Sequence, residues 1–462
     1  NETNLLAGCK ASYLNPPGPS MTVVVRGKYA LAEDGARGPL SLARSEAIND
    51  EHVAVMARVG EEAAKQLLNT SIALGQGSLR GEVYHDDDTQ RVGEILYPGD
   101  FADIKLNAEV MLRGSCCARA QQTECEVAFA VGEWEKRLRV LGPRVRTDDV
   151  AGGVATKPQP VGIMSVDYAH AYGGPGFANN PNGKGHIEKL DDTEAPDELE
   201  EIYQPPRSER SAVMASRQLP NILYADGAET KKDLPASFGP LSPMWPHRMD
   251  RLGKKYDKHW VESRAPGYAA DFDARYFQAA PPDQQLKGYL RGDEQVTFTN
   301  LHPKRAQLTA RLPAFRVRVF VMNDRQEVRE VAVQLDTLYA DLDDNALYLT
   351  WRGHTAARED DLSDWTFGLI DTEALAENPK PKAHYEPLLR AFAADPVGMK
   401  QALPEGFDEF ASGAERLEEA SDAELEAIVD GCMKSDHPGG PTGAMLATMY
   451  GPMAPKLTPA GA

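Results

Sequence analysis

The chain has 462 residues, a hydrophobic share of 42% and a formal net charge of -20. Its length predicts two or three domains, or one large two-layer domain with an appendage. The charge disfavours nucleic acid and anionic membrane surfaces as partners, because both are negatively charged, and it favours a partner with a basic face.

The sequence contains no run of about eighteen apolar residues, which a membrane-spanning helix would need. Residues 1–6 lack the charged start and apolar core of a secretory signal. Five cysteines are few for this length, and their odd number fits free thiols in a reducing compartment. We therefore expect a cytoplasmic protein that does not act at a membrane.

Residues 1–150 predict an antiparallel β-layer. Apolar and β-branched residues open an expected strand, and apolar residues alternate with charged ones in a later one. Gly132 and Glu133 form the turn of an expected hairpin. A four-residue apolar spacing predicts one helix in this part. The expected elements are strands over 22–30, 79–85 and 104–118, hairpin strands over 124–131 and 134–141, and a helix over 51–68.

Residues 151–294, which we call the central shell, are rich in Gly, Pro, Asn and aromatic residues and show no sustained helix or strand period. Such a composition is typical of a disordered linker. Its many Tyr, Trp and Phe side chains need a buried environment, however. We therefore expect an ordered, irregular shell that covers the sheets on either side of it.

Strands resume after the central shell and predict a second β-layer of the same body over residues 295–358. The expected strands are 295–301, 307–312, 315–322, 327–339 and 346–352, with a turn over 341–345. Residues 359–462 predict a helical appendage and tail, in which Ser421 and Glu424 form a capping box. The chain is thus expected to be a β-rich α+β protein with antiparallel, sandwich-like sheets, a long irregular central shell and a helical C-terminal region.

Motifs for catalysis and metal binding are weak. The chain has no Gly-x-Ser-x-Gly motif, and its histidines lack a His-Glu-x-x-His spacing. The glycines within 173–176 and 183–185 favour tight turns over a phosphate loop, because the Gly-Lys-Ser/Thr frame is absent. The adjacent Cys116 and Cys117 favour structural thiols, one buried and one exposed. We expect no cofactor, no bound metal and no catalytic residue.

One alternative from the residues stays open. Asp167, Asp271 and Asp273 in the central shell permit a paired-carboxylate site of the glycosidase type. Because acidic residues are abundant in this chain, such coincidences are expected. A hydrolase that acts on carbohydrate through carboxylates of the central shell is therefore the alternative to a non-enzymatic protein.

Several unusual strings occur in one order along residues 1–352. They are Pro-Gly-Asp-Phe-Ala-Asp-Ile-Lys at 98–105, Tyr-x-x-Ala-Tyr-Gly-Gly at 168–174, Asn-Pro-x-Gly-x-Gly at 180–185, Trp-Pro-His-Arg at 245–248, Phe-Gln-Ala-Ala-Pro-Pro-Asp-Gln-Gln at 277–285, Leu-Arg-Gly-Asp-Glu at 290–294, Leu-Asp-Thr-Leu at 335–338 and Trp-Arg at 351–352. In these strings the chain resembles a bacterial domain-of-unknown-function family encoded beside type VI secretion spike genes. Residues after about 360 lie outside the resemblance.

The resemblance implies a non-enzymatic chaperone or adaptor that binds and stabilises a secreted effector protein and helps to load it onto the VgrG or PAAR spike protein. It implies no catalytic residues. A further alternative is a structural component of the secreted spike itself. We expect exposed aromatic and basic side chains of the central shell to contact the effector. The candidate residues are Tyr168, Tyr172, Trp245, Arg248 and Trp260.

Overall fold

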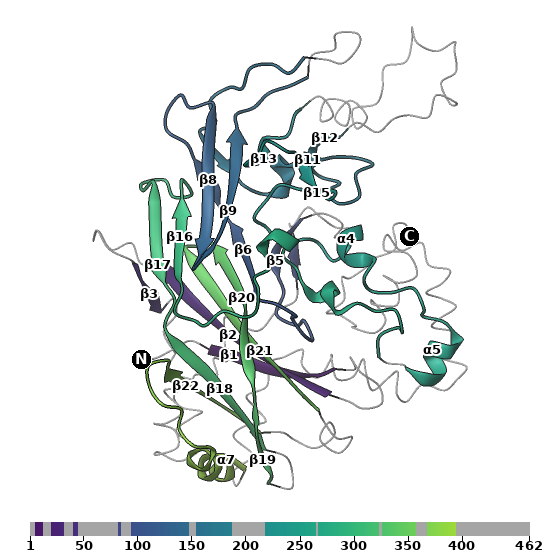
Figure 1. The fold of residues 1–462 in the computed structure, drawn as a ribbon, viewed down its shortest axis with the longest axis vertical. Helices are drawn as coiled ribbons and strands as arrows, with labels where there is room; N and C mark the ends of the chain where they lie inside the picture. Colours follow the sequence, from purple (N-terminus) through teal and green to yellow (C-terminus); the bar gives the residue numbers. More distant parts are fainter. Residues whose placement is uncertain are drawn as a thin grey trace, which may run out of the picture.

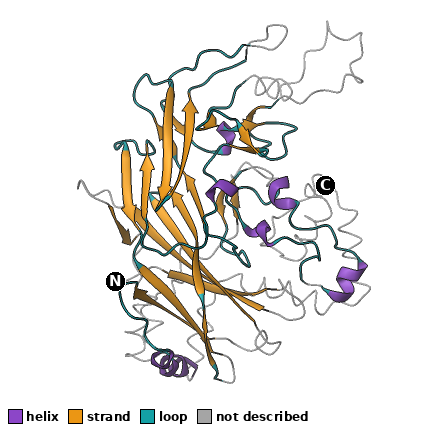
Figure 2. Ribbon diagram, viewed as in Figure 1, coloured by secondary structure: helices purple, strands orange, loops and turns teal. Residues whose placement is uncertain are grey.

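The computed structural model is rich in strands and has few, short helices (Figure 1, Figure 2). It describes residues 5–12, 20–31, 40–44, 82–84, 94–146, 154–186, 218–264, 267–322, 326–356 and 367–393. Within these ranges, no helix is long and apolar enough to cross a membrane. The predicted helix over 51–68 and the predicted capping box at 421–424 lie outside the described residues.

Eleven strands form one large sheet, in which most neighbours are antiparallel. Its order is β13 (Ile222–Tyr224), β9 (Trp134–Leu141), β8 (Glu124–Val131), β16 (Gln295–Thr299), β17 (Gln307–Arg311), β3 (Leu40–Arg44), β2 (Ser20–Leu31), β21 (Ala346–Ala356), β20 (Val333–Asp341) and β6 (Glu109–Arg113), with β1 (Leu5–Ser12) paired to β2 outside this path. The pairs β17–β3 and β20–β6 are parallel. Strands from before and after the central shell therefore alternate within one sheet.

The β-rich, antiparallel character predicted from the sequence is confirmed. The hairpin of β8 and β9 has the predicted bounds, and its turn residue Gly132 has a φ of +58°, which glycine adopts without strain. The strand predicted over 22–30 is β2. The predicted turn over 341–345 joins β20 to β21. Alternating apolar and polar residues explain this agreement, because one face of each strand is buried.

The single strand predicted over 104–118 is wrong. The structure divides this segment into β6 and a short β7 (Ser115–Cys117), and residues 104–108 form no strand. The alternation is also inverted at its start, since Lys105 is 3% exposed and Leu106 is 43% exposed. The ammonium group of Lys105 turns inward because it forms an ion pair with buried Glu109.

A second sheet contains β19 (Val328–Val331), β18 (Phe315–Met322) and β22 (Phe367–Ala374). β22 corrects the prediction of a helical region beyond residue 358, because all eight of its residues pair with β18. The helices described beyond β22 are the short η4 (Lys382–His384) and α7 (Glu386–Ala393). The β-body thus extends past the end of its predicted range.

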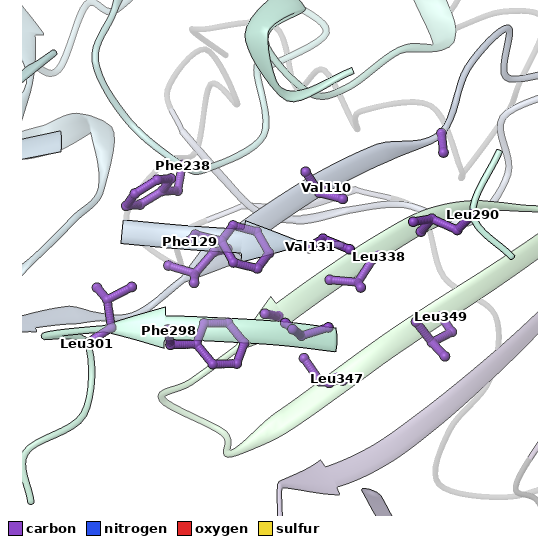
Figure 3. Close-up of a cluster of buried hydrophobic side chains, with 14 of the residues drawn as sticks. Val110, Phe129, Val131, Phe238, Leu290, Phe298, Leu301, Leu338, Leu347 and Leu349 are labelled. Carbon is purple, nitrogen blue, oxygen red and sulfur yellow. The ribbon is translucent and has the colours of Figure 1, made fainter. Parts of the chain in front are cut away.

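The core lies between the large sheet and the segments that cover it (Figure 3). Phe129 of β8 stacks on Phe298 of β16 with ring centroids 5.4 Å apart, and Phe238 of the central shell meets Phe129 edge-on at 6.2 Å. Val110 of β6 belongs to the same cluster. Because β6 ends the strand order and β8 lies near its other end, the sheet curves around a shared core.

The described parts of the central shell are ordered but irregular. They contain short strand pairs and single helical turns in place of a sheet of their own. Besides β13, which joins the large sheet, the strands of the shell are β10 (Ile163–Ser165), paired with β7, then β11 (Tyr172–Gly173), β12 (Lys184–Gly185), β14 (Thr230–Lys231) and β15 (Leu234–Pro235). A further small pair outside the shell joins β4 (Glu82–Tyr84) and β5 (Ile95–Pro98). The helical turns are η1 (Tyr168–His170), α4 (Pro246–Met249), α5 (Lys258–Ser263), η2 (Ala274–Phe277) and η3 (Pro282–Gln284).

Candidate functional site

The segment 277–285 covers the outer edge of β6. The side-chain amide of Gln284 donates to the carbonyl oxygens of Val110 and Phe238, at 2.9 and 2.8 Å. Gln285 forms a β-bridge with Glu109. Backbone carbonyls at a buried sheet edge need such partners, since each one left without a hydrogen bond destabilises the fold. A shell segment therefore replaces the missing neighbour strand.

The same segment also contacts β9, near the opposite end of the strand order. The ammonium group of Lys136 donates to Oε1 of Gln284 at 2.6 Å and to a carboxylate oxygen of Asp283 at 3.1 Å. The indole of Trp134 donates to the carbonyl oxygen of Asp283 at 2.8 Å. Burial lowers the pKa of Lys136, and the Asp283 carboxylate opposes that shift. Segment 277–285 thus links the two ends of the curved sheet.

A row of buried charges lies beside this link. Lys105 and Glu109 form an ion pair with both side chains almost fully buried. The Glu109 carboxylate also accepts from the Gln278 amide at 3.3 Å and from the Ala280 backbone N–H at 3.1 Å. Burial is the largest influence on the pKa of Lys105 and lowers it. Two residues of segment 277–285 therefore provide the remaining hydrogen-bond donors to one buried carboxylate.

The row continues across the neighbouring strands. Arg352 of β21 forms an ion pair with Asp336 of β20, and its guanidinium donates to the carbonyl oxygen of Asp100 at 2.8 Å. Arg26 of β2 pairs with the Asp100 carboxylate at 2.8 Å. We call the six residues of these three pairs the ionic seam: Arg26, Asp100, Lys105, Glu109, Asp336 and Arg352. It matches three cations with three carboxylates on adjacent elements.

The seam fixes the register of the elements that contribute to it. Burial raises the pKa of Asp336, and the neighbouring cations Arg352 and Lys105 oppose the shift. Buried ion pairs add little net stability relative to apolar residues, but loss of one partner leaves a costly unpaired charge. The seam therefore penalises any arrangement in which residues 98–105 are displaced from β2, β20 and β21.

Tyr168 is held in the interior by three kinds of contact. Its ring meets Trp245 edge-on at 4.9 Å, and its hydroxyl donates to the Gly239 carbonyl oxygen at 3.1 Å. Its backbone N–H donates to the buried Glu94 carboxylate at 3.1 Å. Burial raises the pKa of Glu94, as does the charge of Asp167, while hydrogen bonds from backbone N–H groups oppose the shift. The string at 168–174 is thus anchored to the residue preceding β5.

Asn180 fixes the loop that follows Tyr168. Its side-chain amide donates to the carbonyl oxygens of Tyr168 and Tyr172, at 2.7 and 3.0 Å. Gly173 has a φ of +158°, and a Cβ atom there would lie 2.2 Å from the Asn180 carbonyl oxygen. Glycine is required for this close approach. The predicted tight turns in 173–176 are therefore confirmed, and the strings at 168–174 and 180–185 form one packed unit.

Arg248 joins α4 to the segments beside it. Its guanidinium donates to the carbonyl oxygens of Tyr276 and Leu241, both at 2.9 Å. It also lies over the Tyr276 ring, 5.2 Å from the centroid. Trp245 is the N-cap residue of α4, and Pro246 follows at the first helical position, where it needs no N–H partner. Trp245, Pro246 and Arg248 therefore serve packing within the central shell.

The structure buries four of the five candidate contact residues. Tyr168, Trp245, Trp260 and Arg248 are 0%, 1%, 2% and 3% exposed, and Tyr172 is half-buried. Tyr168, Trp245 and Arg248 adjoin one another, whereas Trp260 packs in a separate cluster with Tyr256. The expectation that these side chains are exposed is wrong for the four. Tyr168, Trp260 and Arg248 donate to internal carbonyl oxygens, and the Trp245 ring packs against Tyr168. A direct role in partner binding stays a prediction for Tyr172.

Sequence reasoning missed the residues with the most connections. Gln284 and Asn180 lie inside strings on which the family resemblance rests, and this membership was the one sequence feature that could have pointed to them. Glu94 had no such signal, because a single glutamate before a short strand is unremarkable in an acidic chain. Cys116 is buried, as predicted for one of the two adjacent thiols, whereas Cys117 is half-buried and not exposed. Among the described residues, no group of three or more potential ligands could hold a metal ion.

A model of one bacterial protein family matches residues 19–352 of the chain. The family is described as "Uncharacterized protein conserved in bacteria (DUF2169)". No curated protein and no solved structure matches. The match includes the central shell and every string from 98–105 to 351–352. It confirms a conserved bacterial family and carries no link to type VI secretion.

Proposed function

The chain belongs to this conserved bacterial family, DUF2169, and we propose that it is a non-enzymatic chaperone or adaptor for an effector of type VI secretion. In this role the protein binds and stabilises the effector in the cytoplasm and helps to load it onto the VgrG or PAAR spike. The proposal takes its biological setting from the resemblance in the ordered strings. Its physical support is the construction of the central shell.

The observation that carries the proposal is that polar side chains of the central shell form hydrogen bonds within the protein. Gln284, Asn180 and Arg248 all direct their side-chain donors to backbone carbonyl oxygens within the protein. Such contacts give a rigid covering with a fixed outer surface. A rigid surface favours binding, because less conformational freedom is lost when a partner docks.

Two exposed apolar side chains supply a docking surface, one from the central shell and one from the segment that precedes β6. Leu106 and Tyr289 are 43% and 41% exposed. They adjoin each other, since the Tyr289 hydroxyl donates to the Lys105 carbonyl oxygen at 2.7 Å. We call these two residues the Leu106–Tyr289 patch. Tyrosine is enriched among residues that dominate binding energy, and this one is held in place by the backbone of Lys105, a residue of the ionic seam.

Co-expression with the neighbouring effector gene tests the function. We expect the effector to copurify with this protein and its cellular level to fall when the protein is deleted. The variant Leu106→Ala/Tyr289→Ala should lose copurification while it keeps the wild-type circular dichroism spectrum. If the pair never copurifies and deletion leaves the effector level unchanged, the adaptor function fails. Finding the protein outside the cell with the tip proteins would favour the structural spike component instead.

One observation favours the hydrolase as a second candidate. Burial and the charge of Asp167 raise the pKa of Glu94. Burial acts to raise the pKa of Asp167 too, but hydrogen bonds from His170 and Ser165 outweigh it and leave that pKa lowered. Neighbouring carboxyl groups with opposite shifts are typical of an acid and base pair. Hydrolysis of a carbohydrate by the wild type and its loss in Glu94→Gln would establish this alternative.

A further inference from the structure

A cluster of cationic side chains lies at α4 and the turn that follows it. Arg251 lies one turn after Arg248, and its backbone N–H donates to the Arg248 carbonyl oxygen at 2.9 Å. Arg275 approaches from η2, where the Asp273 N–H donates to the Arg251 carbonyl oxygen at 2.8 Å. Together with His247 these residues gather three guanidinium groups and an imidazole in a chain whose net charge is -20.

One guanidinium of this cluster lacks an ion-pair partner among the described residues. Asp273 accepts from the Arg275 guanidinium at 2.7 Å, and Glu82 lies 3.9 Å from Arg248. The half-buried Arg251 receives no hydrogen bond or ion pair to its guanidinium from the described part of the chain. Burial and the charge of Arg275 lower the pKa of Arg251, and the charge of Asp273 opposes the shift.

His247 adds a second unsatisfied group to the same place. Its Nε2 atom is buried and makes no hydrogen bond to any described residue. Burial, followed by the charges of Arg251, Arg248 and Arg275, lowers the pKa of His247 to about 4. The imidazole is therefore neutral at physiological pH. Buried polar atoms are normally satisfied, so each exception calls for a ligand or a cost in stability.

We propose that His247, Arg251 and Arg275 form a binding site for a carboxylate. A guanidinium presents paired N–H donors that match the two oxygens of a carboxylate. A carboxylate directs both of its oxygens into the plane of one such fork, whereas a tetrahedral phosphate carries further charged oxygens that need partners outside that plane. Arg275 is 62% exposed, so the cluster is open to solvent on that side. A neutral imidazole places a further donor beside the guanidinium groups.

The proposal is independent of the adaptor function. The carboxylate can come from a small organic acid or from an acidic side chain of a bound protein, and both share the chemistry that the site recognises. Succinate tests the small-acid source, and a peptide with two adjacent glutamates tests the protein source. Inorganic phosphate tests the competing assignment. All three probes are added to the full-length chain, whether or not an effector is known.

Nuclear magnetic resonance of histidine-labelled protein reports directly on the site, with the His247 signal assigned by His247→Gln. We expect succinate or the peptide to shift the His247 imidazole signal and to raise its pKa above about 4. Arg251→Gln should weaken binding roughly tenfold to hundredfold, as loss of a charge-assisted hydrogen bond does. Arg251→Lys, which keeps the charge but not the fork, should bind with intermediate affinity. Arg137→Gln, at an exposed arginine of β9, is the matched control and should bind as the wild type.

Three results would overturn the proposal. The first is a His247 signal that neither succinate nor the peptide moves. The second is a shift of equal size in Arg251→Gln, provided that this variant keeps the wild-type dispersion of its other signals. The third is binding of phosphate without binding of either carboxylate probe, which would show that the assigned ligand class is wrong.

Discussion

Lys136 of β9 donates a hydrogen bond of 2.6 Å to the side-chain oxygen of Gln284, whose amide nitrogen donates in turn to the β6 carbonyl of Val110. One side chain therefore connects strands at nearly opposite ends of the large sheet. No β-ladder between these strands does this. This connection is made by a residue of the central shell, so the shell holds the two ends of the curved sheet together.

Replacement of Gln284 should destabilise the protein strongly. Gln284→Ala leaves the carbonyl oxygens of Val110 and Phe238 and the ammonium group of Lys136 short of a partner. The Phe238 carbonyl oxygen keeps the Leu112 N–H and Lys136 keeps Asp283, so the variant loses three hydrogen bonds without orphaning every group. Each lost hydrogen bond costs about 0.5–1.5 kcal/mol, and the one from charged Lys136 costs more, so we expect a loss of roughly 2–5 kcal/mol in the free energy of unfolding. Urea denaturation measures it. Gln285→Ala is the control, since within the described ranges that half-buried amide donates only to the Ala280 carbonyl oxygen. Equal losses would contradict the role of Gln284.

Glu94 should make stability fall as the pH rises. Its pKa in the folded state lies well above the ordinary value of 4.5. The folded state therefore binds the proton more tightly than the unfolded state, and the resulting stabilisation is present below 4.5 and is lost as the pH rises through the folded pKa. Glu94→Gln should remove this dependence. Thermal unfolding across the acid range checks it, with the exposed Glu124→Gln as control; an unchanged slope in Glu94→Gln would contradict the shift.

The ionic seam should show strong coupling between Asp336 and Arg352. Arg352→Met leaves the buried Asp336 carboxylate without its ion-pair partner, which costs about 3–5 kcal/mol. The double variant Asp336→Leu/Arg352→Met removes both charges and should regain most of that loss. A double-mutant cycle by urea denaturation measures the coupling. Additive effects of the two substitutions would show that the pair is not coupled.

Gly173 should tolerate no side chain. In Gly173→Ala the new Cβ would lie 2.2 Å from the Asn180 carbonyl oxygen, so the loop from Tyr172 to Gly185 must shift. Gly162→Ala is the matched control, because its φ is +64° but nothing lies within 4 Å of the added atom. We expect Gly162→Ala to cost only about 1 kcal/mol, the ordinary penalty for a left-handed residue. Similar melting temperatures for the two variants would argue against the close approach.

The sequence predicted the strands well and the shell contacts poorly, for a physical reason. A strand such as β8 or β9 can be predicted because apolar and polar residues alternate along one short segment. The contacts of Gln284 join it to residues 148 and 174 positions away, and no local pattern encodes them. Lys105 shows a different limit, because its partner Glu109 is only four residues away, yet their buried ion pair turns the ammonium group inward against the local alternation.

The candidate site could be predicted only in part. The aromatic content of the central shell indicated that it is ordered, which holds for its described residues. It did not indicate which aromatic rings stay exposed. The Tyr168 hydroxyl donates to Gly239, far along the shell, and the Trp260 indole donates to Gly267, across a turn, and neither contact can be predicted from aromatic content. The exposed Tyr289 has its hydroxyl bound as well, but its ring remains at the surface.

Hydrogen–deuterium exchange of the protein alone and of the protein copurified with its effector tests the central claim most directly. That claim is that the central shell is a rigid covering, and that its residue Tyr289 forms a docking patch with the adjoining Leu106. We predict slow exchange in 237–241 in both states, since Phe238 and Leu241 lie in the core, and added protection in 104–108 and 286–290 only in the complex. Fast exchange of 237–241 in both states, or protection confined to other surfaces, would contradict the account.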